Sequence, residues 1–332
     1  MSVPDQMVID PAAETERICG VMRELLANDL RRRGFVVAMS GGIDSSVSAA
    51  LAVRAVGPSR VFGLFLPERD SDPLSHALAL ELAEQLGIAH TTEDIAPVLE
   101  AAGCYARRDE AIRRVVPQYG AGWKCKLVLP GGGPGSDRLN VTSLVVQDPS
   151  GTQSVVRLGA SEYRQIVAAT NFKQRVRKMM DYYHADRLHY AVVGTPNRLE
   201  YDQGFFVKGG DGLADVKPIA HLYKTQVYAL ADYLGVPERI RTRPPTTDTF
   251  SLPQTQEEFY FAFPARVLDR LLLAYNAGRP AAEVATALGL DEAQVRWAWT
   301  DIAQKRATTR ALHITSLLIE PVPLPLEQEQ RA

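Results

Sequence analysis

The sequence of 332 residues contains little cysteine and no marked excess of either charge. Its three cysteines, Cys19, Cys104 and Cys125, are too few for a disulfide framework, and their spacing matches no common zinc site. Lysine and arginine number 37 and aspartate and glutamate 39, so the net charge is -2. This balance excludes a protein that binds nucleic acid through a bulk positive charge.

Long apolar runs are also missing. No stretch approaches the roughly 18 consecutive apolar residues that a membrane-spanning helix needs. The first residues, MSVPDQMVID, lack the basic and apolar segments of a signal peptide. Hydrophobic residues nevertheless make up 46% of the chain, which is too many for a disordered protein. We therefore expect a soluble, cytoplasmic, globular protein with no membrane partner.

Strand-like runs alternate with helical patterns along most of the chain. Short apolar runs rich in β-branched residues predict strands at 35–39, 60–67, 90–95 and 189–194. Apolar residues at helical spacing predict helices at 12–33, 45–56, 73–87, 161–184 and 224–235, and helical structure from about 254 onward. This alternation indicates an α/β fold with a doubly wound, Rossmann-like parallel sheet.

The region 120–160 interrupts this alternation. It contains three strand-like runs separated by the turn-forming segments PGGGPGSD and DPSG. We expect an inserted β-hairpin or a small three-stranded sheet here, with Gly131–Gly135 as a flexible turn.

The segment Ser40–Ser46 (SGGIDSS) lies between a predicted strand and a predicted helix. Glycines there let the backbone approach a ligand closely, and the free N–H groups at the start of the helix favour an anion. The serine hydroxyls add donors, so the segment is suited to bind phosphate. It has neither the Gly-Lys-Ser/Thr of a Walker loop nor the G-x-G-x-x-G of a dinucleotide fold. The alternative is an ordinary tight turn with a serine or aspartate N-cap.

This segment is similar to the pyrophosphate loop (PP-loop) of the ATP pyrophosphatases. Further motifs follow it in order: residues 171–179 (NFKQRVRKM), 193–200 (VGTPNRLE), 204–215 (GFFVKGGDGLAD), 218–225 (PIAHLYKT) and 245–248 (PTTD). Together they resemble the ammonia-dependent NAD synthetases. The resemblance covers roughly residues 14–105 and 161–260.

The resemblance implies a ligase that forms a C–N bond. ATP would adenylate the carboxylate of nicotinate adenine dinucleotide, and ammonia would then form the amide of NAD, with release of AMP and pyrophosphate. It also implies Mg²⁺ and a two-fold homodimer. Amide formation from a carboxylate and ammonia is uphill in water, so an activation step of this kind is what the chemistry requires. The 34 residues before the first predicted strand cannot hold a glutamine-hydrolysing domain, so we expect free ammonia or ammonia from a separate subunit.

Two carboxylates are suited to hold the metal. Asp44 and Glu200 supply the hard oxygen ligands that Mg²⁺ prefers, and by the resemblance they form the metal pair. The alternative is that Asp44 is an N-cap residue and Glu200 a surface glutamate.

By the resemblance, the PP-loop, one lysine and two threonines bind ATP. The predicted set is Ser40, Gly41, Gly42, Asp44, Ser45, Ser46, Thr195, Lys224 and Thr246. Lys224 would place a cation near the phosphates and would be catalytic together with Asp44 and Asp211. Thr195 follows a glycine at a strand end, where ligands bind in such sheets. Alternatively, Lys224 is a solvated lysine and Thr246 a turn residue.

A basic helix and the loop after the fourth strand would bind the other substrates. By the resemblance, the dinucleotide contacts Asn171, Arg175, Arg177, Lys208 and Asp215. Arg175 lies one helical turn after Asn171, so both can face one groove. Asp211 would stabilise ammonium and help to deliver ammonia. The alternative for the helix is a solvated basic face.

The segment Leu66–Ser71 (LPERDS) follows the second predicted strand. In the family a flexible loop that covers ATP occupies this place. Arg69 or Ser71 could contact phosphates, or the segment could be a connector only.

Two regions depart from the family pattern. Residues 106–160 form an extra segment, which is either a structural embellishment or a changed substrate cap or dimer surface. Residues 255–258 (TQEE) are less acidic than expected in the lid and precede an aromatic-rich stretch. A synthetase that acts on a different carboxylic acid is therefore the alternative function. We expect a PP-loop ATP pyrophosphatase domain at 1–260 that includes the insertion, a helical C-terminal extension at 261–320, and a tail at 321–332.

Other functional classes are less well supported. The helices at 280–306 resemble a helix-turn-helix, but acidic residues oppose the few basic ones, so packing onto the core or a dimer partner is favoured over DNA binding. A nucleotide-binding regulator without catalysis is disfavoured because Asp44, Glu200 and Lys224 are all present. A sulfur-transferring pyrophosphatase acting on tRNA is disfavoured by the lack of paired cysteines and of a basic surplus.

Overall fold

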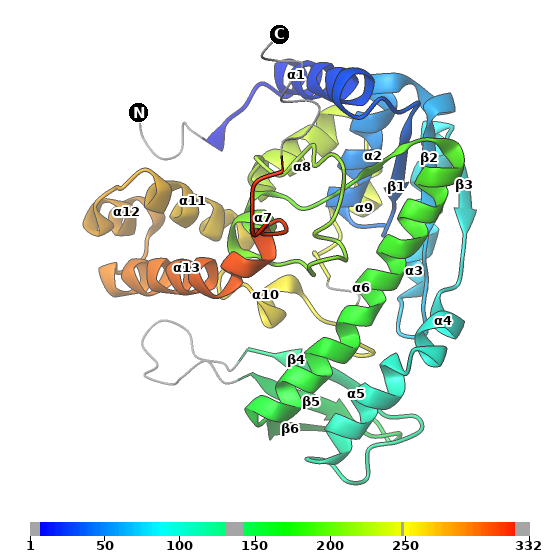
Figure 1. The fold of residues 1–332 in the computed structure, drawn as a ribbon. Helices are drawn as coiled ribbons and strands as arrows, with labels where there is room; N and C mark the ends of the chain where they lie inside the picture. Colours follow the sequence, from blue (N-terminus) through cyan, green and yellow to red (C-terminus); the bar gives the residue numbers. More distant parts are fainter. Residues whose placement is uncertain (1–6, 130–141, 247–248, 323–332) are drawn as a thin grey trace.

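The computed structural model describes residues 7–129, 142–246 and 249–322 (Figure 1). The predicted turn Gly131–Gly135, Asp248 and most of the predicted tail lie outside these ranges.

A four-stranded sheet lies at the centre of the larger part of the chain. Its strands are β1 (Phe35–Ala38), β2 (Val61–Phe65), β3 (Ala89–Thr92) and β7 (Ala191–Val193), in the order β3-β2-β1-β7. Neighbouring strands are parallel, and Phe35 pairs with both Val61 and Ala191. Each of the predicted strands is present, and the predicted parallel sheet is confirmed.

Helices cover both faces of this sheet (Figure 1). One face packs against α1 (Pro11–Glu24), α2 (Ile43–Val56), α3 (Pro73–Leu86) and α8 (Lys224–Tyr233), and the other against α4 (Ala96–Ala101), α5 (Cys104–Arg113) and α6 (Ala160–Leu188). Within β1, Phe35 and Val37 face the first group, whereas Val36 packs with Ala185 of α6. Strands covered on both faces are apolar throughout, which explains the continuous apolar run and confirms the doubly wound fold.

The starts of α1 and α3 lie within one residue of the predicted starts, and an aspartate side chain caps each of them. Asp10 and Asp72 accept backbone hydrogen bonds at the starts of α1 and α3. The helix predicted at 12–33 is shorter, because α1 continues only as a π-helical turn, Leu25–Asp29. Four short helices were not predicted from the sequence: α4, α5, α7 (Arg198–Gln203) and α9 (Glu238–Arg241). Helices of 4 to 10 residues show too few periods of apolar spacing.

A second, antiparallel sheet lies below the first in Figure 1. Its strands are β4 (Lys124–Val128), β5 (Ser143–Gln147) and β6 (Gln153–Arg157), which confirms the three-stranded form of the predicted insertion. Alternate residues of β4 and β5, among them Leu127 and Leu144, form a core with Ile112 of α5 and Ile166 of α6. The long helix α6 therefore spans both sheets.

The short helix α10 (Gln256–Phe259) packs against β4, and the C-terminal part that follows consists of α11 (Ala265–Asn276), α12 (Ala281–Leu288) and α13 (Glu292–His313). It has its own apolar core, which also contains Leu199 of α7. The buried side of α13, including Val295 and Ile302, faces this core. The helices that resemble a helix-turn-helix are thus packed onto the rest of the protein, as favoured above. None of the helices in the described ranges is both long enough and apolar enough to cross a membrane.

Candidate active site

A cavity of about 600 Å³ opens where β1, β2 and β7 end. Ligands bind at this position in open parallel sheets, because the loops that follow the strands converge there. Most of the predicted site residues line it: Ser40, Gly42, Asp44, Ser45, Asn171, Arg175, Arg177, Thr195, Glu200, Lys208, Asp211, Lys224 and Thr246. Three predicted residues, Gly41, Ser46 and Asp215, do not line the cavity.

The PP-loop has the backbone geometry that its glycines permit. Gly41 has φ +73°, and a Cβ at this position would overlap the carbonyl oxygen of Ser75 on α3. Gly42 is the N-cap of α2 and offers no side chain to its first N–H groups. These groups therefore remain available to an anion in the cavity.

The loop hydroxyls stabilise the loop itself. Ser45 Oγ and Ser46 Oγ donate to the carbonyl oxygen of Gly42, at 3.0 and 2.8 Å. Ser40 Oγ lies 3.1 Å from Ser45 Oγ and accepts a hydrogen bond from Gly42 N. Gly41 and Ser46 thus contribute to the shape of the loop from outside the cavity lining.

Asp44 connects three elements of the site. Its carboxylate forms an ion pair with Lys224 Nζ at the start of α8 and accepts a hydrogen bond of 3.1 Å from Asn197 Nδ2. Asn197 caps α7, where Glu200 Oε2 accepts a hydrogen bond of 3.1 Å from its backbone N–H. Gln256, on α10, donates to the other oxygen of Glu200 at 2.9 Å. The two predicted metal ligands and the predicted lysine therefore belong to one network, to which the sequence analysis had not assigned Asn197 or Gln256.

The charges of this network shift one another's pKa values. Burial, followed by the negative charge of Asp44, raises the pKa of Glu200 to about 7. Burial alone would lower the pKa of Lys224, but the charges of Asp44 and Glu200 outweigh it and raise the pKa above its usual value. Lys224 is only 2% exposed, so the alternative of a solvated lysine is wrong for this fold.

The backbone of Lys224 is held by Asp269, a residue that was not predicted from the sequence. Asp269, on α11, is fully buried, and its carboxylate accepts hydrogen bonds from the backbone N–H groups of Lys224 and Thr225. It also accepts a hydrogen bond of 2.8 Å from the hydroxyl of Thr225.

The cationic wall of the cavity comes from α6. Arg177 Nε donates to the carbonyl oxygen of Leu66 at 3.3 Å, and Arg175 Nε to that of Lys208 at 3.3 Å. Further along the helix, Lys178 and Asp181 form a buried ion pair of 2.8 Å that also lines the cavity and that the sequence analysis missed. Arg175, Arg177 and Lys178 therefore line the cavity, although the side chain of Arg175 remains exposed to solvent.

The loop after β7 contributes fewer side chains to the cavity than its motif suggests. Asp211 Oδ1 accepts a hydrogen bond of 2.7 Å from Val207 N, and burial raises the pKa of Asp211. Lys208 Nζ donates to two carbonyl oxygens at the end of α13, each at 2.8 Å. Asp215 Oδ2 accepts from Val192 N at 2.7 Å, so this carboxylate fastens the loop to β7 outside the cavity.

Two threonines and an arginine complete the lining. Thr195 follows β7, and Thr246 forms an isolated bridge with Thr255, the N-cap of α10. Arg243, which the sequence analysis missed, donates to Ser75 Oγ at 3.0 Å and to Asp72 Oδ2 at 2.9 Å. It thereby connects the segment before Thr246 to the start of α3, beside the PP-loop.

Comparison with known proteins decides the family. The family profile described as NAD synthase matches residues 14–115 and 141–311, most of the chain. The chain belongs to the NAD synthase family.

The most similar curated relatives include an NH(3)-dependent NAD(+) synthetase of Rhizobium meliloti (strain 1021). It is 59% identical over 318 residues, which cover 96% of this chain and 95% of the relative. An NH(3)-dependent NAD(+) synthetase of Thermotoga maritima is 38% identical over 241 residues, which cover 73% and 79% of the two chains. The predicted function, a C–N bond-forming ligase of the ammonia-dependent NAD synthetase type, is confirmed at this level of similarity.

Solved structures support the fold of this NAD synthase family member. The NH3-dependent NAD synthetase from Campylobacter jejuni superimposes with a TM-score of 0.61 over 94% of this chain and all of the other, at 21% identity. A structure described as NMN synthetase from Francisella tularensis gives the same TM-score at 24% identity, over 95% and 99% of the chains. At these identities the likeness concerns the fold alone.

Proposed function

We propose that this chain adenylates the carboxylate of nicotinate adenine dinucleotide with ATP and converts it to the amide of NAD with ammonia. The observation that carries the proposal is the network of Asp44, Lys224 and Glu200 beside the PP-loop. This network lines the same cavity as the basic residues of α6. The 59% identity to a named NH(3)-dependent NAD(+) synthetase over nearly the whole chain agrees with it.

ATP binding is assigned to the β1–α2 turn and its surroundings. The N–H groups at the start of α2 would bind the β- and γ-phosphates, and Lys224 would neutralise charge that develops on the phosphate oxygens. Ser40, Gly42, Ser45, Thr195 and Thr246 border the same cavity. Gly41 and Ser46 act through the shape of the loop.

Asp44 and Glu200 would hold Mg²⁺. Their donor chemistry fits, because Mg²⁺ commonly binds one or two carboxylates together with substrate phosphates. The described residues offer no cluster of three or more His, Cys, Asp or Glu side chains for a metal, so phosphate oxygens would complete the ligand set. The charge of Asp44 already disfavours ionised Glu200, which is the electrostatic situation that a divalent cation relieves. Bound there, the ion would stabilise negative charge on the phosphates.

The chemical steps then follow from the placement of the groups. The substrate carboxylate attacks the α-phosphorus of ATP, the bond to the β-phosphate breaks, and pyrophosphate leaves from the PP-loop. Asn171, Arg175 and Arg177 would hold the dinucleotide along α6, with Lys208 at the edge. Ammonia then attacks the acyl carbon, the bond to the AMP oxygen breaks, and the nitrogen loses one proton, which the phosphate of the departing AMP can take up. Asp211 would take up the proton that ammonium gives up, a role that suits a carboxyl whose pKa is raised by burial.

The direct test is a pyrophosphate assay. The purified chain is incubated with ATP, Mg²⁺ and ammonium, with and without nicotinate adenine dinucleotide, and pyrophosphate and NAD are measured. Release that requires the dinucleotide and matches NAD formation supports the proposal. Release only with a different carboxylic acid would instead support the alternative synthetase, and no release with any acid would support a nucleotide-binding protein without catalysis.

Three further parts of the proposal concern the chain as a whole. Residues 1–260 form the PP-loop domain with an insertion at 106–160, and 261–320 form the helical extension; the family profile leaves residues 116–140 unmatched, which agrees with the insertion. The chain forms a homodimer. The exposed apolar side chains of Met179 and Tyr183, one turn apart on α6, are candidates for its interface. It works in the cytoplasm, where its three free and buried cysteines stay reduced.

A further inference from the structure

The charged residues of the loop that follows β2, Leu66–Asp72, lie mostly outside the cavity lining. Pro67 and Ser71 line the cavity, whereas Glu68, Arg69 and Asp70 do not. The guanidinium of Arg69 lies 3.7 Å from the centre of the Tyr105 ring on α5 and so points toward that helix. The idea that Arg69 contacts phosphates therefore has no support in this arrangement, and the three charged side chains need another explanation.

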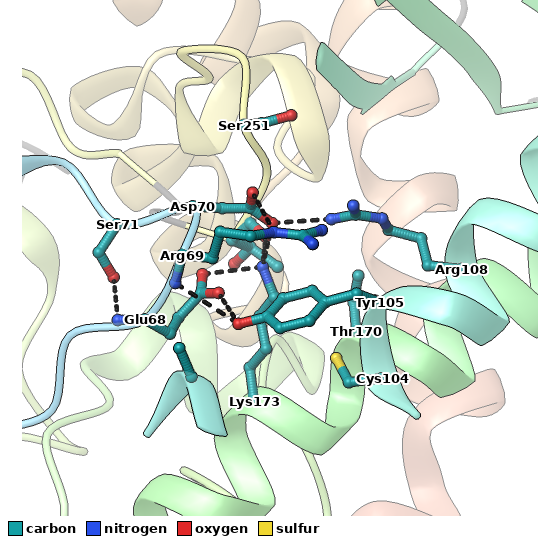
Figure 2. A network of polar contacts seen from close by, with 12 residues as sticks. Glu68, Arg69, Asp70, Ser71, Cys104, Tyr105, Arg108, Thr170, Lys173 and Ser251 are labelled. Carbon is teal, nitrogen blue, oxygen red and sulfur yellow. Dashed lines mark hydrogen bonds and ion pairs between the residues drawn. The ribbon is translucent and has the colours of Figure 1, made fainter. Parts of the chain in front are cut away.

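Lys173 provides that explanation. It lies on α6 between Asn171 and Arg175, its side chain is fully buried, and its Nζ has three acceptors (Figure 2). Nζ lies 2.8 Å from Glu68 Oε1, 2.8 Å from Asp70 Oδ2 and 2.7 Å from the carbonyl oxygen of Thr249. One ammonium group thus joins α6 to two segments that are more than 70 residues away in the sequence.

The remaining groups of the network balance the charge. Tyr105 OH donates to Glu68 Oε2 at 2.8 Å, and Arg108 donates to Asp70 Oδ2 at 2.7 Å (Figure 2). Burial alone would raise the pKa of Asp70, but Lys173 and Arg108 outweigh it and hold the pKa below its usual value, so the carboxyl stays ionised. Arg69 Nε also lies 3.8 Å from Asp70 Oδ1, and Arg108 also pairs with Asp109, so three cations face three carboxylates.

Both segments contain residues that line the cavity. In the first segment, Ser71 receives a hydrogen bond from Glu68 N and borders the cavity directly. In the second, Thr249 lines the cavity, and Ser251 accepts a hydrogen bond of 2.9 Å from Cys125 N of β4. Removing the ammonium would release both walls and would leave Glu68 without its cation, while Asp70 would keep its ion pair with Arg108.

A buried ion pair is a poor way to gain stability, because desolvation costs about as much as the attraction returns. Buried charges of this kind are better explained by the geometry that they impose. We propose that Lys173 is a positioning residue for ATP, which fixes the Leu66–Asp72 and Thr249–Leu252 segments at the nucleotide end of the cavity through Glu68, Asp70 and the Thr249 carbonyl. The inference rests on the proposed function, and it concerns ATP more than the dinucleotide, whose proposed contacts lie on α6 itself.

The test compares Lys173→Met with the double variant Glu68→Gln/Lys173→Met and with the control His184→Gln. The double variant removes one cation and one anion, and it leaves the Asp70–Arg108 pair intact. His184 is also buried on α6 and contacts Glu93, but it does not line the cavity, so its loss perturbs the same helix without touching either segment. For each protein, the melting temperature, the KM values for both substrates, kcat and the Kd of ATP by calorimetry are measured.

Lys173→Met should raise KM and Kd for ATP at least tenfold and change KM for the dinucleotide much less. ATP would have to re-order the two released segments on binding, and each 1.4 kcal/mol of that cost is about tenfold in Kd. The double variant should regain much of the lost melting temperature and still bind ATP weakly, because the connection between the segments stays broken. His184→Gln should lose stability and keep the wild-type KM for ATP. If both Lys173 variants bind ATP within twofold of wild type, Lys173 is a structural residue only and the inference is wrong. If the wild-type protein releases no pyrophosphate, the proposed function fails, and the Kd of ATP still decides the role of Lys173.

Discussion

The carboxylate of Asp269 on α11 accepts a hydrogen bond of 3.1 Å from the backbone N–H of Lys224, the first residue of α8. The same carboxylate binds the N–H and hydroxyl of Thr225. It therefore acts as an N-cap from another helix, and it fixes the helix turn from which the Lys224 side chain reaches Asp44. The C-terminal helices are in this way connected to the centre of the active site.

Asp269→Asn should lower kcat by roughly a hundredfold, because an amide offers one acceptor oxygen and turns N–H donors toward the donors of Thr225. The loss of a buried, charge-assisted cap should also cost about 1.5–3 kcal/mol of the free energy of unfolding. Steady-state kinetics at saturating ATP and urea denaturation measure the two effects.

Asp291→Asn is the matched control. Asp291 caps α13 in the same C-terminal region by accepting a hydrogen bond of 2.7 Å from Gln294 N, but it has no connection to Lys224. This variant should lose a few tenths to about 1 kcal/mol of stability and keep its kcat. If both variants lower kcat equally, the effect of Asp269 is on folding alone.

These residues also show what the sequence can and cannot reveal. The PP-loop was found because its glycines, Asp44 and the start of α2 are neighbours in the sequence, so their chemistry is a local property. Asp269 was missed because its partner is 45 residues away. The only signal was an acid among the leucines of an amphipathic helix, and that pattern does not name a partner. Lys173 lies inside a recognised motif, but its partners Glu68 and Asp70 are about 100 residues distant. Asp215 also lies in a recognised motif, which led to its prediction as a substrate-binding residue. Its carboxylate instead accepts a hydrogen bond from the backbone of β7, a contact that forms only when the loop is folded.

Gly41→Ala should weaken ATP binding at least tenfold. The alanine would have to adopt φ +73° and its Cβ would overlap the Ser75 carbonyl oxygen, so the loop would have to move away from α3. Gly87→Ala separates the two effects, because Gly87 has φ +66° but no atom within 4 Å of the added Cβ. That control should lose about 1–2 kcal/mol of stability and bind ATP normally. Calorimetric titration with ATP distinguishes the variants, and equal affinities would show that contact with α3 does not set the loop geometry.

The native protein should react very slowly with a thiol reagent at pH 8. Burial raises the pKa of Cys19 and of Cys104 to about 11, and it also raises the pKa of Cys125. At a pKa of about 11, roughly one thiol in a thousand is ionised at pH 8, and only the thiolate reacts. Absorbance after addition of Ellman's reagent should report three thiols in denaturant and fewer than one in the native protein over the same time. Fast modification of the native protein would mean that at least one of these sites opens readily.

Glu200→Gln should separate stability from catalysis. Burial and the charge of Asp44 both disfavour an ionised Glu200, and the side-chain amide of Gln256 can rotate to accept from the new NH₂ group. A neutral amide of the same shape should therefore leave the melting temperature of the metal-free protein unchanged or raise it. The variant would at the same time lose one of two proposed Mg²⁺ ligands. The Mg²⁺ concentration for half-maximal pyrophosphate release should therefore rise at least tenfold, since even residues that only orient a metal ligand contribute about 10- to 100-fold. Glu283, on α12, forms an exposed ion pair with Arg279, which precedes the helix. The control Glu283→Gln should therefore match the wild type in both measurements. A wild-type Mg²⁺ dependence for Glu200→Gln would remove Glu200 from the metal site and leave it as the residue that completes the capping box of α7 with Asn197.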